Sequence, residues 1–394
     1  MWSKERTRLW VVLVVFFATS GVRSSAGIRP SFSLDGCVWN ATHIVLVETT
    51  SKGGVFSVLK SWKGNLNAGE TIEIPELKPD EKAAAISDYA RLAEGESGKR
   101  PSVYEQIPRQ PSGSRMILFL KKLQSSETSS PNVPASAWEP ASDWGGMKVS
   151  VVWIDSGRSY CFLQWMNPGP AVLSECVRGP ELSSDPDVVT SRIQQVLRVQ
   201  RELTGAVAAK NADIRIRRLG RIALGDVLPA QRQAFEALGQ EGVAALPEIL
   251  QVLDKPPNFY DGEQLIRVLV EAAGHDSGRV LHARLQGDLS YWKLVGPTLT
   301  REWLGQLLEP GSPLHVKFNE TALIVQELDR EHYVPARETV AELKDFWISH
   351  PQLYDPKWGR TGRNGGTAQQ AVEHYAFGLA EECHRFIEHI NSAH

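Results

Sequence analysis

The segment Glu236-Ala237-Leu238-Gly239, with Leu246 and Leu250 after it, returns 35 residues later as Glu271-Ala272-Ala273-Gly274, with Leu281 and Leu285 after it. A period of this length is typical of proteins built from stacked helix pairs. In each copy we expect a helix to end at the glycine, Gly239 or Gly274, because a residue without Cβ readily adopts the left-handed turn that stops a helix. A single helix pair cannot bury its apolar face alone. The repeat therefore predicts an array of packed helices with an extended binding surface.

The helical period extends on both sides of this repeat. We expect the second helix of the first copy to cover residues 243–254, with Val243, Leu246 and Leu250 on one buried face and Pro247 in the first turn. Buried faces of the neighbouring helices are predicted at Val189, Ile193, Val196, Leu197, Ile216, Leu219, Ile222, Ala223, Leu265, Val268, Leu269 and Ala272. This half resembles HEAT-like helical repeats, most clearly over residues 214–285. The resemblance implies a scaffold or binding platform.

Length and composition limit the class of protein. A chain of 394 residues exceeds what one hydrophobic core usually supports, which predicts two domains. The formal net charge is -3, and no long block of one sign occurs, so charge does not point to a nucleic acid or an acidic membrane as partner. An apolar fraction of 42% with 23% charged residues is typical of a folded chain.

The N-terminus has the pattern of an export signal. Lys4, Arg6 and Arg8 precede an apolar run over residues 9–18, and small residues follow. The run is short for a membrane span, which favours cleavage, with residues 24–26 as the preferred site and residues 18–20 as the second. We therefore expect a periplasmic or secreted protein that keeps no integral membrane segment after cleavage.

Apolar residues alternate with period two between Cys37 and Trp165. The pattern predicts about six strands, at residues 44–48, 54–62, 70–74, 116–120, 147–155 and 159–165, arranged as a small barrel or sandwich. A hairpin about the turn at residues 167–170 would place Cys161 opposite Cys176, and export would permit a disulfide there. The alternatives are a Cys37–Cys161 pair and buried thiols, because sequence does not fix connectivity.

A short motif in this region carries a second resemblance. Residues 58–64, Val-Leu-Lys-Ser-Trp-Lys-Gly, lie between two predicted strands and look like the strand-and-turn passage of netrin-like domains. These are OB-type barrels that include the tissue inhibitors of metalloproteinases. The inhibitors chelate the protease metal through an N-terminal Cys-x-Cys. Here Cys37 is followed by Val38 and Trp39, so the resemblance implies the fold and not the inhibition.

Three groups of residues invite a binding site, and each has a simpler interpretation. Four arginines near residue 218 are interpreted as a solvated polar face with salt bridges to a neighbouring helix, because they lack interleaved aromatic residues and the chain is not basic overall. Four potential metal ligands near the C-terminus, one cysteine and three histidines, do not share a helix face, since the spacing of five residues between the histidines rotates each side chain by about 140° from the last. A glycine-rich stretch before the last helix is a candidate anion site or a flexible connection. In order, the groups are Arg215, Arg217, Arg218 and Arg221; Cys383, His384, His389 and His394; and Arg360, Arg363 and Thr367.

Three other signals are weaker. Residues 95–99, Gly-Glu-Ser-Gly-Lys, lack the first glycine and the final Ser or Thr of a phosphate-binding loop. Trp138 and Trp144, in a long polar loop, are expected to pin that loop rather than to stack on a ligand. His43 is expected to be a hydrogen-bonded residue at a strand end rather than a catalytic base.

Together these patterns predict an α+β protein of two domains after a signal peptide at residues 1–26. An OB-like β-domain covers residues 27–180 and a HEAT-like helical domain residues 181–394. The sequence favours a non-enzymatic interaction protein with a protein or glycan partner and no metal or cofactor. The alternatives are an exported hydrolase with its site on the β-domain loops, and a structural protein of the cell envelope.

Overall fold

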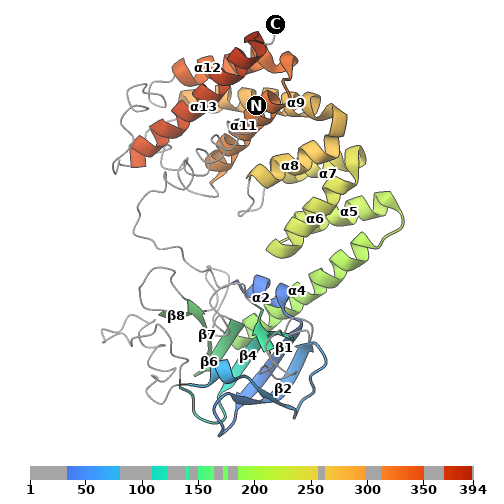
Figure 1. The fold of residues 1–394 in the computed structure, drawn as a ribbon, viewed down its shortest axis with the longest axis vertical. Helices are drawn as coiled ribbons and strands as arrows, with labels where there is room; N and C mark the ends of the chain where they lie inside the picture. Colours follow the sequence, from blue (N-terminus) through green and yellow to red (C-terminus); the bar gives the residue numbers. More distant parts are fainter. Residues whose placement is uncertain are drawn as a thin grey trace, which may run out of the picture. The chain divides into compact units, whose positions relative to one another are not determined.

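The computed structural model divides into two compact units, Met1–Glu202 and Leu203–His394. It describes residues 33–79, 109–122, 138–141, 150–163, 172–175, 185–255, 262–298, 312–349 and 368–392. The first unit holds an antiparallel sheet and the second is helical (Figure 1). The α+β class is thus confirmed at this level.

Within the described residues the sheet has eight strands, in the order β3-β2-β1-β4-β6-β7-β8 with β5 paired to β4. All strand pairs among the described residues are antiparallel. The strands are β1 (His43–Thr49), β2 (Val55–Lys63), β3 (Thr71–Glu73), β4 (Arg115–Lys122), β5 (Trp138–Pro140), β6 (Val151–Asp155), β7 (Arg158–Leu163) and β8 (Val172–Glu175). Chain neighbours β1, β2 and β3 form a meander, as do β6, β7 and β8. Among the described residues, no pairing joins β3 to β8.

Both faces of the sheet are buried at its central strand, β4. In β4, all residues from Met116 to Leu120 are less than 4% exposed, as expected of a strand with a covered surface on each side. One face packs into a single cluster: Val45, Val47, Phe56, Val58, Ile72, Ile74, Leu77, Met116, Leu118, Leu120, Val151, Trp153 and Tyr160. Leu77 is supplied by a short 3₁₀ helix, η1 (Pro75–Leu77).

Two helices are fixed to this unit by charged side chains. Helix α2 (Leu34–Asn40) and helix α4 (Pro186–Val207) are joined by a two-pronged ion pair, in which Arg192 donates to Asp35 at 2.6 and 2.9 Å. Lys63 on β2 donates from Nζ to the carbonyl oxygens of Val38 and Trp39, at the C-terminal end of α2. A cation there satisfies carbonyl groups that the helix leaves without partners.

The register of β7 and β8 corrects the expected cysteine pairing. Ser174 lies opposite Cys161, two residues before the position that the predicted hairpin assigned. Cys37, Cys161 and Cys383 are buried thiols, and Cys176 lies outside the described residues. The structure therefore does not support a disulfide between Cys161 and Cys176, nor one between Cys37 and Cys161.

The described part of the second unit is helical. Its helices are α5 (Ala212–Ala223), α6 (Leu228–Gln240), α7 (Leu246–Asp254), α8 (Gly262–Ala273), α9 (Ser277–Val295), α11 (Pro313–Arg330), α12 (Arg337–Ser349) and α13 (Ala368–Ser392). Three pairs share one connection: α6 with α7, α8 with α9, and α11 with α12. Each has a 3₁₀ helix that a residue of positive φ begins or shortly precedes, which is η3 (Gly242–Ala245), η4 (Gly274–Asp276) or η6 (Val334–Ala336).

The left-handed residues of these turns are Gly242, Gly274 and His332, with φ of 66°, 56° and 51°. The prediction for Gly274 is confirmed, and that for Gly239 is wrong, because α6 continues through Gly239 to Gln240. A Cβ at Gly239 would lie 3.1 Å from Cγ1 of Val268. Gly239 thus allows α6 to lie close to α8, and the chain turns three residues later.

The extra turn also shifts the buried face of α7. Val243 belongs to η3 and is 61% exposed, whereas Ile249, Val252 and Leu253 are buried. The predicted face of Val243, Leu246 and Leu250 is therefore wrong. In the second copy, Leu281 and Leu285 are fully buried as expected. The predicted apolar faces of α5 and α8 are buried as well. In α4, three of the four predicted residues are buried, namely Val189, Ile193 and Val196.

Successive helix pairs pack on their neighbours. Helix α8 contacts α6 and α7 before it and α9 and α11 after it, while α13 contacts α11 and α12. Between α9, α11 and α12 the core is aromatic. Trp292, Phe318 and Trp347 meet edge to face, with ring centroids 5.1 to 6.4 Å apart. Such pairs add to the free energy gained by burying their area.

Two glycines of α9 test this packing within one helix. A Cβ at Gly278 would overlap the ring of Tyr333, so Gly278→Ala should destabilise the protein by about 1 to 3 kcal/mol through overpacking. A Cβ at Gly287 meets no atom within 4 Å, and Gly287→Ala should stabilise the helix by about 0.5 to 1 kcal/mol. Urea unfolding followed by circular dichroism measures both. Equal effects of the two substitutions would contradict the close approach of Tyr333.

Candidate functional site

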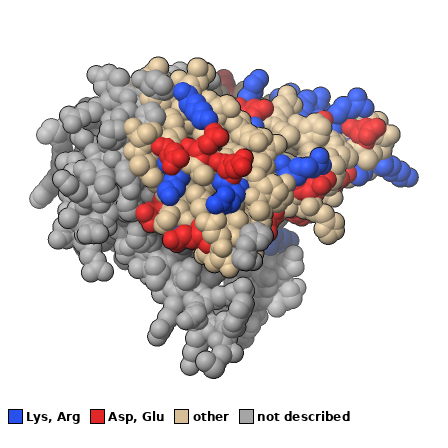
Figure 2. Space-filling view, turned by 90° about the horizontal axis from the view of Figure 1, so that it is seen from above, with Lys and Arg blue, Asp and Glu red and all other residues tan. Residues whose placement is uncertain are grey.

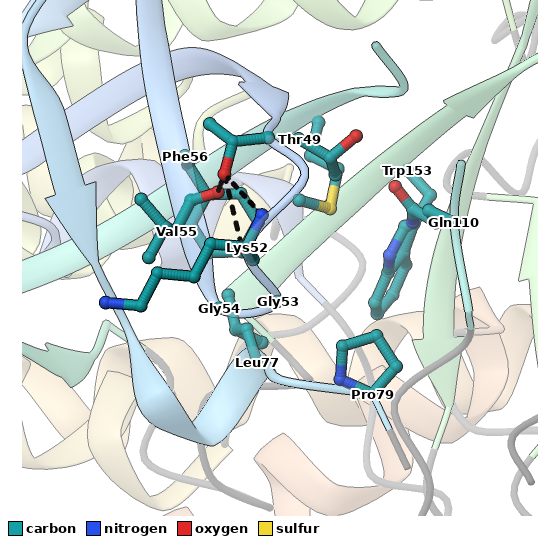
Figure 3. A pocket seen from close by; sticks show the side chains of 12 residues that line it. Thr49, Lys52, Gly53, Gly54, Val55, Phe56, Leu77, Pro79, Gln110 and Trp153 are labelled. Carbon is teal, nitrogen blue, oxygen red and sulfur yellow. Dashed lines mark hydrogen bonds between the residues drawn. The ribbon is translucent and has the colours of Figure 1, made fainter. Parts of the chain in front are cut away.

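One cavity of the sheet unit lies beside the turn from β1 to β2 (Figure 3). It measures about 40 Å³, enough for a few water molecules. Thr50 Oγ1 binds the Val55 carbonyl oxygen at 2.9 Å and the Lys52 amide at 3.2 Å, which closes the turn. The described residues that line the cavity include neither a carboxylate nor a histidine. The cavity therefore offers no acid–base pair.

His43 has the structural role that the sequence predicted. It is 8% exposed, and its ring nitrogens lie 3.0 Å from Thr42 Oγ1 and 2.9 Å from Asn65 Oδ1. Trp138 packs edge to face on the ring, with centroids 4.9 Å apart. A Cβ at Gly64 would overlap the imidazole. With both nitrogens bound and the ring enclosed, His43 is a packing residue that holds Trp138 in place.

The helical unit contains a buried charge network that the sequence reading missed. Lys317 Nζ on α11 lies 2.6 Å from Asp288 Oδ1 on α9 and 2.9 Å from Glu320 Oε2. Arg284 donates from Nε to Glu320 Oε1 at 2.6 Å and also binds Asp254 at the end of α7. Asp288 is fully buried and Glu320 is 7% exposed. The network ties α7, α9 and α11 together.

Hydroxyl and indole groups complete this network. Thr321 Oγ1 donates to Asp288 Oδ2 at 3.0 Å and accepts from Trp292 Nε1 at 3.0 Å. Burial, and after it the charge of Glu320, raise the pKa of Asp288 to about 6 against the opposing effects of Lys317 and Arg284. Burial lowers the pKa of Arg284, but the hydrogen bonds to Glu320 and Asp254 outweigh that effect and raise it overall. The network is enclosed, which favours a role in packing over one in catalysis.

The arginine cluster of α5 separates into two parts. Arg215 donates from Nη2 to Glu241 Oε2 at 2.6 Å and from Nη1 to the Ala209 carbonyl oxygen at 2.6 Å. These bonds lower the pKa of Glu241 and raise that of Arg215. Arg215 therefore fixes α5 to the turn after α6, as the interpretation of a salt-bridged face predicted.

The other three arginines face outward on α5. Ile214, Arg217, Arg218 and Arg221 are all exposed and enclose a surface hollow of about 240 Å³. We call these four residues the α5 stripe. Arg217 Nε donates to the Asp213 carbonyl oxygen at 3.2 Å. Neither Arg218 nor Arg221 forms an ion pair with a residue in the described part of the chain. The salt bridges expected for these arginines are not found there.

The stripe is local in extent. Figure 2 shows Lys and Arg interspersed with Asp and Glu over the described part of one face, without a broad area of one sign. With the formal charge of -3, this pattern is unlike the continuous basic surface of a nucleic-acid-binding domain. The stripe is the candidate functional site of the helical unit.

The C-terminal residues do not form a metal site in the described part. Cys383 is fully buried, and burial raises the pKa of its thiol. His384 Nε2 lies 3.1 Å from Glu388, and His389 Nδ1 lies 3.0 Å from Asp329 on α11. No group of metal-ligating side chains occurs among the residues that the structure describes. His394 lies outside them.

Several candidate residues cannot be placed. Arg360, Arg363 and Thr367, proposed as an anion site, lie outside the described residues, as do residues 95–99 and Trp144. The same holds for most of the β-domain loops on which a hydrolase site was considered. The expectations about them stay predictions.

The raised pKa of Asp288 predicts a pH dependence of stability. The pKa of Asp288 in the folded protein, about 6, exceeds its ordinary pKa of 3.8. Protonated Asp288 therefore contributes stability that is fully present below pH 3.8 and is lost as the pH rises through about 6. Asp288→Asn removes this loss. Its free energy of unfolding relative to the wild type should rise by up to about 3 kcal/mol between about pH 4 and about pH 7.

Urea denaturation across that range, followed by circular dichroism, measures the difference. Asp254→Asn, which removes the exposed carboxylate of the same network, is the matched control. A difference for Asp288→Asn that does not change with pH would show that Asp288 is ionised throughout.

Comparison with protein-family models, with curated proteins and with solved structures finds no match to this chain.

Proposed function

We propose that the protein is an exported, non-enzymatic interaction module whose helical unit is a HEAT-like binding platform and whose sheet unit is an OB-like domain. The observation that carries the proposal is the order of packing in the helical unit. Helix pairs of one design, with a left-handed residue and a 3₁₀ turn between the helices, contact the pair before and the pair after. An array of this kind leaves the outward side chains of several helices accessible to one partner.

The described chemistry favours binding over catalysis. The ionisable groups that depart most from their ordinary pKa are Arg284, Asp288 and Cys383, and each is largely enclosed by packed helices. Charged groups at the surface, in contrast, include the α5 stripe, which has space in front of it. A partner that brings its own charges fits this arrangement better than a substrate that must reach a buried acid.

Export rests on the sequence alone. The basic residues Lys4, Arg6 and Arg8 before a short apolar run support a periplasmic or secreted location. None of the described helices has the length and apolar character that crossing a membrane requires.

Site-specific photo-cross-linking in living cells tests the platform. A photoreactive amino acid replaces Arg218, Val243 or Leu294, which are exposed on the helical unit, and Lys52 on the sheet unit is the control position. We expect discrete adducts from at least one helical position, and the cross-linked species should be recovered from the extracytoplasmic fraction. Adducts from Lys52 alone would contradict the proposal. So would the absence of adducts at every position when the protein itself is found in the extracytoplasmic fraction.

A further inference from the structure

The α5 stripe follows from the spacing of its residues. Ile214, Arg217, Arg218 and Arg221 stand at positions i, i+3, i+4 and i+7, so they share one face of the helix. The opposite face is apolar and buried through Ile216, Leu219, Ile222 and Ala223. The backbone of a packed helix therefore holds three guanidinium groups together on the surface.

Most of the other arginines in the described part of the helical unit have a counter-charge, whereas none of the three in the stripe forms an ion pair there; Arg232 and Arg337 also have no carboxylate partner among the described residues. Six arginines of this unit have a carboxylate partner: Arg215, Arg267, Arg279, Arg284, Arg330 and Arg385. The carboxylate of Asp213, at the start of α5, makes no ion pair with the stripe; Arg217 binds its carbonyl oxygen instead. Three like charges within two helical turns repel one another, and an anionic partner would relieve that repulsion.

We propose that the α5 stripe is a docking site for an acidic polypeptide segment in extended conformation, with carboxylates at alternate positions. The proposal rests on the proposed function and names the partner class of that platform. Guanidinium groups form paired hydrogen bonds with carboxylates, and these are among the stronger polar contacts in proteins. The hollow of about 240 Å³ between the four side chains leaves room for such groups to approach.

The spacing of the charges matches an extended chain. Arg217 and Arg221 are separated by about 6 Å along the helix axis, at 1.5 Å per residue. Side chains on one side of an extended peptide repeat about every 6.8 Å, at roughly 3.4 Å per residue. Two carboxylates two residues apart can therefore bind Arg217 and Arg221 together, with Arg218 beside them. Ile214, 40% exposed at the N-terminal end of the stripe, offers a contact for an apolar residue of the same segment.

A nucleic acid fits the stripe less well. From Ile214 to Arg221 the stripe extends about 10 Å along the axis, which covers few phosphates, whereas nucleic-acid binding gains affinity from many phosphate contacts along a basic track. No aromatic side chain stands within the stripe to stack on a base. An anionic membrane would also require a broader basic surface.

Fluorescence anisotropy with the full-length protein tests the proposal. The probe is a labelled peptide of about eight residues with glutamate at every second position and leucine at one end, a length that spans the stripe at roughly 3.4 Å per residue. We expect saturable binding that weakens with salt, and no binding of the same peptide with glutamine in place of glutamate. A single-stranded oligonucleotide and vesicles of anionic phospholipid are tested alongside.

Two charge-matched variants locate the binding site. Arg217→Gln, Arg218→Gln and Arg221→Gln together remove the stripe, and glutamine keeps a helix propensity close to that of arginine. Arg267→Gln, Arg279→Gln and Arg330→Gln together remove the same charge from exposed positions on α8, α9 and α11. We expect the dissociation constant for the peptide to rise by about tenfold or more in the first variant and to change little in the second. Circular dichroism checks that both variants are folded.

Four results would overturn the proposal: no binding of the glutamate peptide, equal binding of the glutamine peptide, equal weakening by both variants, or tighter stripe-dependent binding of the oligonucleotide or the vesicles. The platform itself can survive such a result. If cellular cross-links from Val243 or Leu294 persist in the stripe variant, the helical unit binds its partner elsewhere. If these cross-links are also absent from the wild type, the proposed function fails with the stripe.

Discussion

The helical unit depends on the burial of one apolar helix between two others. Helix α8 carries Leu265, Ile266, Val268, Leu269, Ala272 and Ala273, each less than 5% exposed, and it packs on helices both before and after it. Its start contacts α11, since Gly262 lies close to Leu323. Its end contacts α6, where Gly239 lets the two backbones approach. Without α8, α6 and α11 would each expose part of an apolar face. The packing of α8 thus sets the positions of the helices that carry the charged groups.

Charge is used in two different ways in this unit. Asp288, Glu320, Lys317 and Arg284 are placed between helices and compensate one another, and breaking one such pair leaves a buried charge without compensation. Arg217, Arg218 and Arg221 face solvent on a terminal helix and are not compensated by carboxylates of the described chain. The first arrangement specifies how α7, α9 and α11 meet, and the second is available to a partner. This difference is why the stripe, rather than the more perturbed buried network, is the candidate site.

Local patterns predicted the elements better than the turns. The apolar face of α5, made by Ile216, Leu219, Ile222 and Ala223, is buried as the spacing of these residues indicated, because a helix that packs on a core must turn its apolar face inward. The 35-residue repeat placed the end of α6 wrongly at Gly239, since a glycine that allows a close contact inside a helix looks the same in sequence as a glycine that ends one. The residue that takes the left-handed conformation after α6 is Gly242, whose φ is positive.

Contacts between distant residues were beyond the sequence. The register that places Ser174 opposite Cys161 depends on how the two strands are aligned, and alignments that differ by two residues keep the same alternation of apolar residues. The ion pair of Asp288 and Lys317 joins α9 and α11 through residues that are 29 positions apart in the chain. A signal was nevertheless present, since Asp288 interrupts the buried series of Leu281, Leu285 and Leu289. A carboxylate in such a series predicts a buried partner without identifying it.

Hydrogen exchange of the full-length protein carrying Leu269→Ala tests the central role of α8 most directly. Leu269 is fully buried, and its truncation should cost about 2 to 5 kcal/mol. We expect faster exchange throughout α6, α7, α8, α9 and α11, with unchanged protection of β1, β2 and β4, because the helices share their apolar faces and the sheet has its own core. Faster exchange confined to α8 itself, or equal loss of protection in the sheet, would contradict the account of helix pairs that are stable only when stacked.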